Sequence, residues 1–243
     1  MSPKWIELMK KWETKKREQM AEAVMRPPVC TTLLKVVIPF PGIVLIMGDR
    51  GAGKTATACA IMDAFHKSRY QLGGTVKLPE PLPKGKKHIF PSWIKLVYQI
   101  KNLPHRSVCL IDEASQVAHA RRSQSANNLD MDNLVSISRQ RQQLIILVCH
   151  HSRKLDLNDV HSSSLIVWKQ PTYADTLWER DELQRYSLRA IDFFEGLKTK
   201  QARLRASFMM DLRHMRFYSM NNGLPSWWND DLSAVFSLFK TED

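Results

Sequence analysis

Eight consecutive residues, GDRGAGKT from Gly48 to Thr55, have the types and spacing of a loop that grips phosphate groups. The backbone N–H groups of such a loop point inward at phosphate oxygens, and its glycines permit that geometry. In this arrangement Lys54 bridges the β- and γ-phosphates of a nucleotide, and Thr55 ligates Mg²⁺. The predicted nucleotide-binding residues are Gly48, Asp49, Arg50, Gly51, Ala52, Gly53, Lys54, Thr55 and Ala56.

The segments on either side of this loop are those that phosphate binding requires. An apolar strand, GIVLIMG, is predicted over 42–48, and a helix is predicted over 54–68. A helix N-terminus favours anions because its first N–H groups have no partner within the helix. A chance match in a glycine-containing turn would lack this strand–loop–helix context.

A second motif, SVCLIDEAS at 107–115, ends an apolar strand with two acids. A carboxylate at the end of a buried strand can sit beside the phosphate loop, so Asp112 is predicted to hold Mg²⁺, mostly through water. Glu113 is predicted to orient or deprotonate the attacking water. Small-molecule kinases need no such glutamate, whereas NTP hydrolases do. The alternative is a strand that ends on two solvated acids.

A third apolar strand, in LIILVCHHSRKLD at 144–156, ends in two histidines. A polar residue at this strand tip can touch the γ-phosphate, and His151 is the predicted sensor, with His150 in reserve. A metal site is disfavoured because no carboxylate or cysteine cluster accompanies the pair. The alternative is a pair of loop histidines without a phosphate contact.

Arginines flank the same strand. Arg139 and Arg141 lie before it, at the end of a predicted helix, and Arg153 lies just after it. An arginine that reaches across a subunit interface neutralises charge in the transition state of phosphoryl transfer, and Arg139 and Arg141 are predicted for that role. Surface charge or a contact to DNA is the alternative for each of them.

The chain of 243 residues has 36 Lys and Arg against 24 Asp and Glu, a net charge of +12. This excess favours a polyanionic partner, either nucleic acid or an anionic membrane surface, and a solvated basic surface is the alternative. Arg121 and Arg122 are predicted to contact the phosphate backbone of DNA. No base-reading motif occurs, so sequence-independent binding is expected. A second basic patch is expected from Lys198, Lys200, Arg203, Arg205, Arg213 and Arg216.

Short β-branched stretches alternate with helix-compatible ones through the middle of the chain. This order predicts an α/β fold with a mainly parallel sheet flanked by helices. The expected strands cover 33–40, 42–48, 107–113, 144–150 and 163–169, the expected helices cover 54–68, 93–103 and 129–142, and a loop is expected over 71–92.

The two ends of the chain are predicted to be helical. Residues 3–24 have the pattern of a basic amphipathic helix, which could pack on the core, contact a neighbouring subunit or lie on a surface. After Pro171 the strand signals stop, and helices are expected over 174–216 and 226–239. We therefore expect three parts: an N-terminal arm, 1–29, a P-loop ATPase core, 30–172, and a C-terminal helical segment, 173–243.

The cysteines and the hydropathy pattern predict a soluble, intracellular protein. Cys109 and Cys149 lie within apolar runs and are predicted to be buried thiols, which favours a reducing compartment. No apolar run approaches the roughly 18 residues of a membrane span, and no signal peptide is visible.

The succession GDRGAGKT, VCLIDEAS and LVSISRQRQQLIILVCHHSRKLD resembles the FtsK–HerA superfamily of P-loop ATPases over about residues 40 to 170. His151 stands where that family often has a glutamine sensor, and Arg139 or Arg141 falls on its arginine-bearing helix. The resemblance implies a RecA/ASCE-like fold, ATP and Mg²⁺ as cofactors, and a homo-oligomeric ring, usually a hexamer, that moves double-stranded DNA. In such rings the position of Arg121 and Arg122 tends to face the central pore.

Compact members of this superfamily include the genome-packaging ATPases of viruses with internal membranes. A chain of that kind would be virion-associated and would have capsid or membrane-vertex proteins as partners. The C-terminal segment matches no part of the family pattern.

Four other functions are compatible with a phosphate-binding loop. An AAA+ type helicase loader or transposition regulator would carry a further arginine in a C-terminal helical lid. A phage assembly ATPase of the zonula-occludens-toxin type would act at a membrane, against which the lack of a membrane span counts. The Asp112–Glu113 pair and the basic charge disfavour a nucleotide kinase. A binding module that uses ATP only as a structural ligand would show no turnover.

Overall fold

The computed structural model describes most of the chain from Ile38 onward. The predicted helix over 3–24, and most of the one over 226–239, lie outside the described residues. The described ranges are 38–68, 71–82, 89–112, 114, 126–221, 223–229 and 231–232.

One sheet of eight strands forms the centre of the described part, in the order β3-β2-β4-β5-β1-β6-β7-β8. The strands from β3 to β6 in this order run parallel, whereas β7 and β8 are antiparallel to their neighbours. The predicted α/β class with a mainly parallel sheet is therefore confirmed. The strands are β1 (Gly42–Gly48), β2 (Gly73–Lys77), β3 (Ile94–Val97), β4 (Ser107–Ile111), β5 (Leu144–Val148), β6 (Leu165–Lys169), β7 (Ala206–Asp211) and β8 (Arg216–Asn221).

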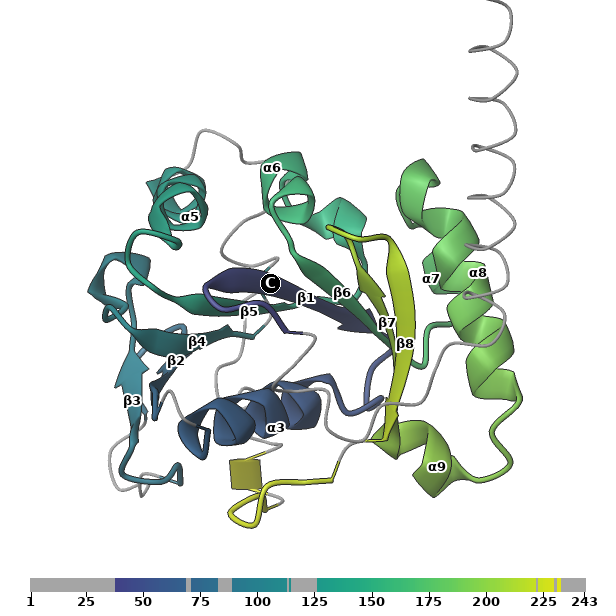
Figure 1. The fold of residues 1–243 in the computed structure, drawn as a ribbon, viewed down its shortest axis with the longest axis horizontal. Helices are drawn as coiled ribbons and strands as arrows, with labels where there is room; N and C mark the ends of the chain where they lie inside the picture. Colours follow the sequence, from purple (N-terminus) through teal and green to yellow (C-terminus); the bar gives the residue numbers. More distant parts are fainter. Residues whose placement is uncertain are drawn as a thin grey trace, which may run out of the picture.

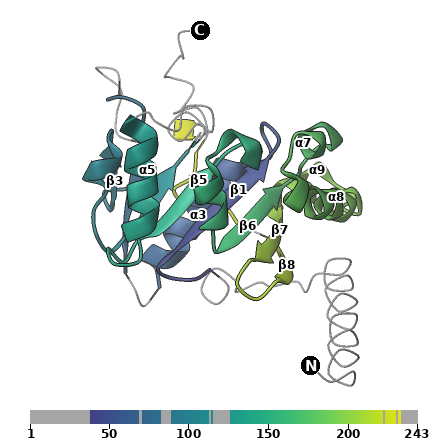
Figure 2. The ribbon, with the colours of Figure 1, turned by 90° about the horizontal axis from the view of Figure 1, so that it is seen from above.

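Helices cover both faces of this sheet (Figures 1 and 2). Helix α3 packs against one face, and α5, α6 and α8 supply buried side chains to the core on the other. The helices are α3 (Lys54–His66), α5 (Ala126–Ile137), α6 (Leu157–His161), α7 (Tyr173–Leu177), α8 (Asp181–Glu195) and α9 (Lys200–Arg205), with 3-10 turns η1 (Ile100–Asn102) and η3 (Ser152–Lys154).

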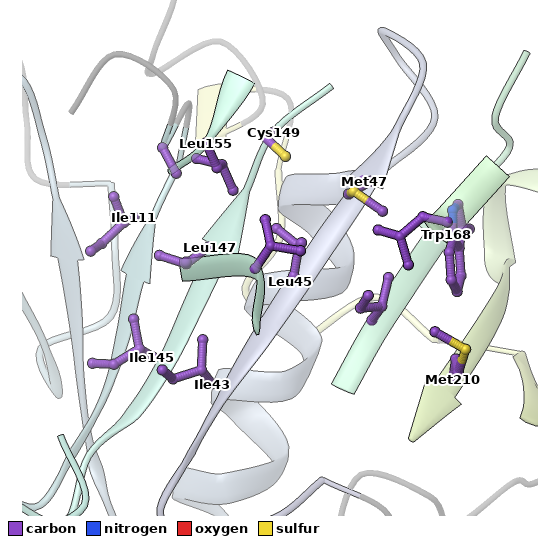
Figure 3. Close-up of a cluster of buried hydrophobic side chains, with 14 of the residues drawn as sticks. Ile43, Leu45, Met47, Ile111, Ile145, Leu147, Cys149, Leu155, Trp168 and Met210 are labelled. Carbon is purple, nitrogen blue, oxygen red and sulfur yellow. The ribbon is translucent and has the colours of Figure 1, made fainter. Parts of the chain in front are cut away.

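The central strands are apolar on both faces because both faces are covered. In β1, Val44 and Ile46 join the core beneath α3, whereas Leu45 and Met47 join the core on the other side of the sheet. Figure 3 shows this second core, in which the side chains of β1 lie between those of β5 and Trp168 of β6. The continuous apolar runs of the sequence thus build a rigid sheet that positions the loops at its ends.

Two elements differ from the prediction at the β3 edge of the sheet. Residues 73–77 form β2 where a loop was expected, and 94–97 form β3 where a helix was expected. A Cβ at Gly74 would lie 2.6 Å from the Trp93 ring, so the close packing at this position of β2 requires glycine. Pairing with β4 and β3 overrides the weak strand propensity of the glycines.

The largest difference lies in the C-terminal segment. Helices α7, α8 and α9 form as expected, but 206–221 fold as the hairpin β7–β8, which continues the sheet beside β6. The run ASFMMD is helix-compatible by composition, yet five of its six residues are buried between neighbours on the sheet. Burial on both faces outweighs a helix propensity worth a few tenths of a kcal/mol per residue.

Smaller differences concern element ends. The described part of the expected strand 33–40, residues 38–40, is not a strand, in keeping with the prolines at 39 and 41. Helix α5 ends at Ile137, five residues before the predicted end at 142. The arginines that follow it therefore lie in a turn rather than on the helix.

Candidate nucleotide-binding site

The phosphate loop, Asp112 and the two histidines converge on one end of the parallel strands. The phosphate loop follows β1, Asp112 follows β4, and His150 and His151 follow β5. Since β4, β5 and β1 are neighbours and run parallel, their carboxyl ends lie side by side. Ligands of open α/β sheets bind at this end of the strands.

Two glycines give the phosphate loop its shape. Gly48 has a φ of 141° and Gly53 a φ of 84°, in the region that favours glycine. A Cβ on Gly48 would lie 1.8 Å from the carbonyl oxygen of Lys169. The loop therefore leaves β1 in close contact with the end of β6, and no other residue type fits at Gly48.

Lys54 begins α3 and is buried. Its Nζ donates hydrogen bonds to the carbonyl oxygens of Gly48, at 2.9 Å, and Asp49, at 2.8 Å. The ammonium group is therefore held over the loop, and a bound phosphate would compete with these two carbonyls for it. This is the position that its predicted role requires.

Thr55 and Asp112 are brought into contact from positions 57 residues apart. The Thr55 hydroxyl donates to the Asp112 carboxylate at 2.6 Å, and Asp112 is buried. Hydroxyl and carboxylate oxygens are the ligands that Mg²⁺ prefers. The two residues thus fit the magnesium site predicted from the sequence, at the first turn of α3.

Cys59 of α3 is buried in the core close to Asp112. Burial, followed by the negative charge of Asp112, raises the pKa of the Cys59 thiol well above its usual range. Burial also raises the pKa of Cys109, to about 12. Cys59, Cys109 and Cys149 are buried thiols that form no disulfide, which confirms the expectation for Cys109 and Cys149.

Three of the predicted residues lie outside the described part of the chain. They are Glu113, predicted to activate water, and Arg121 and Arg122, predicted to contact DNA. Their neighbour Asp112 is described, so Glu113 follows directly after a carboxylate that contacts the first turn of α3. The roles of the three residues stay predictions.

The two histidines lie beside the phosphate loop. The Gly48 N–H donates to the His150 carbonyl at 3.1 Å, which ties the loop after β5 to the start of the phosphate loop. Burial, then the positive charge of Lys154, lowers the pKa of His151, so its imidazole is neutral at pH 7. The buried Nδ1 of this ring has no hydrogen-bond partner among the described residues.

Two residues of the connection between α7 and α8 form a clamp that holds the loop carrying His151. The buried carboxylate of Glu179 accepts from the backbone N–H of Ser152 at 3.2 Å and also from the Ser152 hydroxyl. Arg180 donates to the Leu155 carbonyl at 2.8 Å. Burial raises the pKa of Glu179. Sequence reasoning missed this clamp, because a single glutamate after Trp178 carries no spacing signal.

Lys169 is a second residue that sequence reasoning missed. It ends β6, is fully buried, and pairs with Gly48 in the sheet register. A signal was present: a lone lysine directly follows the apolar run LIVW, at the same strand end as the other site residues. The hairpin that buries it could not be foreseen, because the residues of β7 were expected to be helical.

The predicted catalytic arginines lie at the other end of the sheet. Arg139 and Arg141 precede the amino end of β5, whereas the phosphate loop lies at the carboxyl end of the neighbouring β1. One length of a five-residue strand, about 16 Å, separates these ends. Arg141 donates to the Leu103 carbonyl, whereas Arg139 lines an open hollow of about 580 Å³ together with Arg213. Neither is brought to the nucleotide site of its own chain.

Arg153 and the basic residues of the predicted C-terminal patch do not gather at one place. Arg153 pairs with Asp181 at 2.8 Å. The hairpin separates the C-terminal set, since β7 starts next to the carboxyl end of β6 and its far end pairs with the amino end of β6. Lys198, Lys200, Arg203 and Arg205 therefore lie toward the phosphate-loop end, and Arg213 and Arg216 lie toward the opposite end.

Within the described residues, neither a membrane span nor a cluster of metal-binding side chains occurs. No described helix is both long and apolar enough to cross a bilayer. No group of three or more His, Cys, Asp or Glu side chains in this part of the chain is arranged to hold a metal ion. The expected magnesium site differs, because it uses one hydroxyl and one carboxylate.

Comparisons with known proteins place the fold. No family model matches the sequence, and no curated protein matches it. The structure is similar to the DNA-packaging ATPase B204 of Sulfolobus turreted icosahedral virus, with a TM-score of 0.54 and 15% identity, over 76% of this chain and 98% of that one. The genome-packaging NTPase B204 of Sulfolobus turreted icosahedral virus 2, in complex with ATPγS, gives a TM-score of 0.53 at 13% identity, with the same coverage.

A more distant similarity extends to the N-terminal domain of zonular occludens toxin from Neisseria meningitidis, with a TM-score of 0.44 and 14% identity, over 83% of this chain and 100% of that domain. The B204 structures confirm the P-loop NTPase fold that the sequence motifs predicted. They also confirm, at the level of fold, the resemblance to genome-packaging ATPases.

Proposed function

We propose that this protein is an ATP-hydrolysing motor that moves double-stranded DNA as an oligomeric ring. The observation that carries the proposal is the contact of Thr55 with Asp112 at the foot of the phosphate loop, in a fold similar to that of viral packaging ATPases. It joins the two motifs that an NTP hydrolase needs. The net charge of +12 supports a polyanionic partner.

Each site residue has a role in this proposal. The loop amides and Lys54 bind the phosphates of ATP, Thr55 and Asp112 hold Mg²⁺, and Glu113 activates the attacking water. The metal supplies charge neutralisation at the β- and γ-phosphates when it is bound. His151, neutral at pH 7 and beside the loop, reports the γ-phosphate through a hydrogen bond.

The transition-state arginine comes from a second copy of the chain. Arg139 and Arg141 lie a strand length away from their own phosphate loop, so either can act only on the nucleotide of a neighbouring protomer. Arg139 is the better candidate, because the Arg141 guanidinium already donates to Leu103. A ring of such protomers has a shared active site at each interface.

DNA is bound through its phosphate backbone, independent of sequence. Arg121 and Arg122 are the proposed contacts, on the segment that follows Asp112 and Glu113. Nucleotide turnover and movement of this segment would then be coupled through the strand end that they share. Capsid or membrane-vertex proteins are the proposed docking partners if the chain serves a virion.

The structure removes one basis for the AAA+ alternative. That reading rests on a helical lid over 176–216, but 206–211 form a strand of the central sheet. An arginine on α9 would have to contact the nucleotide from within the domain that contains the sheet, not from a separate helical lid. We therefore retain the DNA motor as the proposed function.

The experiment is steady-state ATP hydrolysis with and without long double-stranded DNA, at several protein concentrations. Stimulation by duplex DNA that rises cooperatively with protein concentration is expected, since active sites are shared between protomers. The matched control is the Arg121→Ala/Arg122→Ala variant, in which DNA binding should weaken and its salt dependence should flatten. Turnover indifferent to DNA would contradict the motor and leave a protein-activated ATPase.

A further inference from the structure

A fully buried lysine lies directly beneath the phosphate loop. Lys169 ends β6, and its backbone lies against Gly48 so closely that only glycine fits there. Its side chain lies on the α3 face of the sheet, because Leu165 and Val167, at alternating positions of the same strand, belong to the core beneath α3. The same face carries the phosphate loop and the start of α3.

The ammonium group of Lys169 holds the junction between α9 and β7. Its Nζ donates to the carbonyl oxygen of Leu204 at 2.8 Å and also to that of Ala206. Leu204 is the fifth residue of α9, and Ala206 is the first residue of β7. These carbonyls end a helix, where backbone acceptors otherwise lack partners.

This junction touches the phosphate loop from below. The nearest atom to a Cβ built on Gly53 is the Leu204 carbonyl oxygen, at 3.4 Å, and the next is Cε of Lys169, at 3.9 Å. Gly53 directly precedes Lys54 and is in the left-handed region, with a φ of 84°. The last turn of the loop thus rests on a surface formed by Lys169 and the α9–β7 junction.

A buried cation at this place is costly unless it has a structural or ligand-binding purpose. Burial lowers the pKa of Lys169 to about 7, whereas the two accepting carbonyls favour the charged form. The bound anion expected above the loop would favour it further, since opposite charges attract across a medium of low dielectric constant. An apolar side chain would fill the same space without bonding the junction.

We propose that Lys169 is a positioning residue of the nucleotide site, which fixes the α9–β7 junction against Gly53 and so couples occupancy of the phosphate loop to the C-terminal hairpin. The inference rests on the proposed nucleotide binding and adds a residue that no sequence motif assigns. It gives the β7–β8 hairpin a function in the site. Nucleotide binding should therefore stabilise the backbone about 35 residues beyond Lys169, at the start of β7.

The test compares two substitutions on the same face of β6 in the full-length protein. Lys169→Met keeps the volume but removes the bonds to Leu204 and Ala206, whereas Val167→Ala weakens the same core without touching the loop. Isothermal titration with Mg²⁺ and ATPγS should show on the order of tenfold weaker binding for Lys169→Met. Val167→Ala should lower the Tm and leave the Kd unchanged.

The outcomes separate this inference from the proposed function. If the wild-type protein binds no ATPγS, the proposed nucleotide site itself is contradicted. Wild-type binding with an unchanged Kd in Lys169→Met would overturn only the positioning role. Equal loss of affinity in both variants would also overturn it, because a general loss of core stability would then explain the effect.

Hydrogen exchange on the wild-type protein tests the same inference if Lys169→Met does not fold. Addition of Mg²⁺ and ATPγS should slow amide exchange at residues 203–207, around the α9–β7 junction. The turn at 212–215, at the far end of the hairpin, is the internal control and should not change. Protection of the phosphate loop without protection of 203–207 would overturn the coupling.

Discussion

Asp112 and Glu113 are adjacent in the sequence but are predicted to do different chemistry. Asp112 contacts the Thr55 hydroxyl, in the position expected of a magnesium ligand. Glu113 is one residue further from the buried strand and is predicted to act on water. Neutralising each carboxylate separately should therefore affect binding and hydrolysis differently.

Glu113→Gln should keep ATP binding and lose turnover, by on the order of a hundredfold or more, because the amide cannot accept a proton from water. Asp112→Asn is the matched neighbour, and it should instead weaken binding in a Mg²⁺-dependent way. Titration calorimetry measures ATP binding, and the rate of phosphate release measures turnover. Normal turnover in Glu113→Gln would remove the catalytic assignment.

Lys169 should make the stability of the protein depend on pH. Burial lowers its pKa to about 7 in the folded state, from an ordinary value of 10.5 in the unfolded chain. Between these values the unfolded chain holds more protons, so the free energy of unfolding rises with pH in this window. Below about pH 7 both states are protonated, and the destabilising effect is complete.

The wild-type protein should therefore gain stability relative to Lys169→Met between about pH 7 and pH 10. Urea unfolding of both proteins across this range measures the difference, in which the other titrating groups cancel. Parallel pH profiles would mean that the Leu204 and Ala206 carbonyls keep the ammonium charged throughout.

Much of the candidate site could be predicted from the sequence because its residues follow apolar strands. The phosphate loop, Asp112 and His151 all follow the carboxyl ends of strands, and parallel strands bring such ends together. Glu179 gave no such signal, since it lies between two helices and reaches the site only through packing. The separation of Arg139 from the loop could have been inferred from the sequence, because Arg139 precedes its strand whereas the loop follows its own, and the two strands are parallel.

At the scale of elements, the hairpin β7–β8 is the feature that joins the C-terminal segment to the sheet. Phe208 of β7 is fully buried and packs against Trp168 of β6, with ring centroids 5.9 Å apart, and against Phe193 of α8. The segment 173–221 therefore shares a core with the parallel strands. Whether 173–243 unfolds as a separate part becomes a question that a single substitution can answer.

Phe208→Ala should lower the free energy of unfolding by about 3–5 kcal/mol, because it leaves a cavity between β6, α8 and β8. Urea unfolding, followed by circular dichroism and by tryptophan fluorescence, should shift in one cooperative step. Leu177→Ala, at a side chain that is 74% exposed, is the control and should change stability little. Two separate transitions would show that the segment is an independent domain.

The elements that the sequence predicted well are those with strong local signals. The strands β1, β4, β5 and β6 are continuous apolar runs, and α3 follows directly from the phosphate loop. The strands β2, β3, β7 and β8 were missed, and for β2 and β7 one reason is that glycines in one and methionines in the other have little strand propensity. Both are strands because of the neighbours with which they pair, which no local pattern records.

At the scale of the whole molecule, the two ends of the parallel strands carry different groups. One end holds the phosphate loop, and the other holds Arg139 beside a hollow that Arg213 also lines. In the proposed ring, each protomer would contribute its phosphate loop to one active site and its Arg139 to the next, so that two protomers complete each site.

Mixing two inactive variants tests this arrangement. Lys54→Ala should lose hydrolysis because it cannot grip the phosphates, and Arg139→Ala should lose it because no guanidinium reaches the neighbouring site. A mixture should recover part of the activity, since an Arg139→Ala protomer can bind ATP next to a Lys54→Ala protomer that supplies arginine. Arg141→Ala is the control for a structural arginine.

Activity in the Arg139→Ala protein alone would show that this arginine is not needed. Recovery in a mixture of Lys54→Ala with Arg141→Ala, but not with Arg139→Ala, would assign the role to Arg141. No recovery in either mixture would contradict a shared site, provided that the variants assemble with each other.

Leu204 and Ala206, which accept hydrogen bonds from Lys169, are synthesised well after the phosphate loop that they support. The strands β1, β4, β5 and β6, which bear the phosphate loop and its partners, have all been synthesised when residue 169 is added. The residues that cover Lys169 follow about 35 positions later. With the proposed role of Lys169, a nascent chain carries its phosphate loop without this support until the α9–β7 junction has emerged from the ribosome, and nucleotide should stabilise the growing chain only from that point onward.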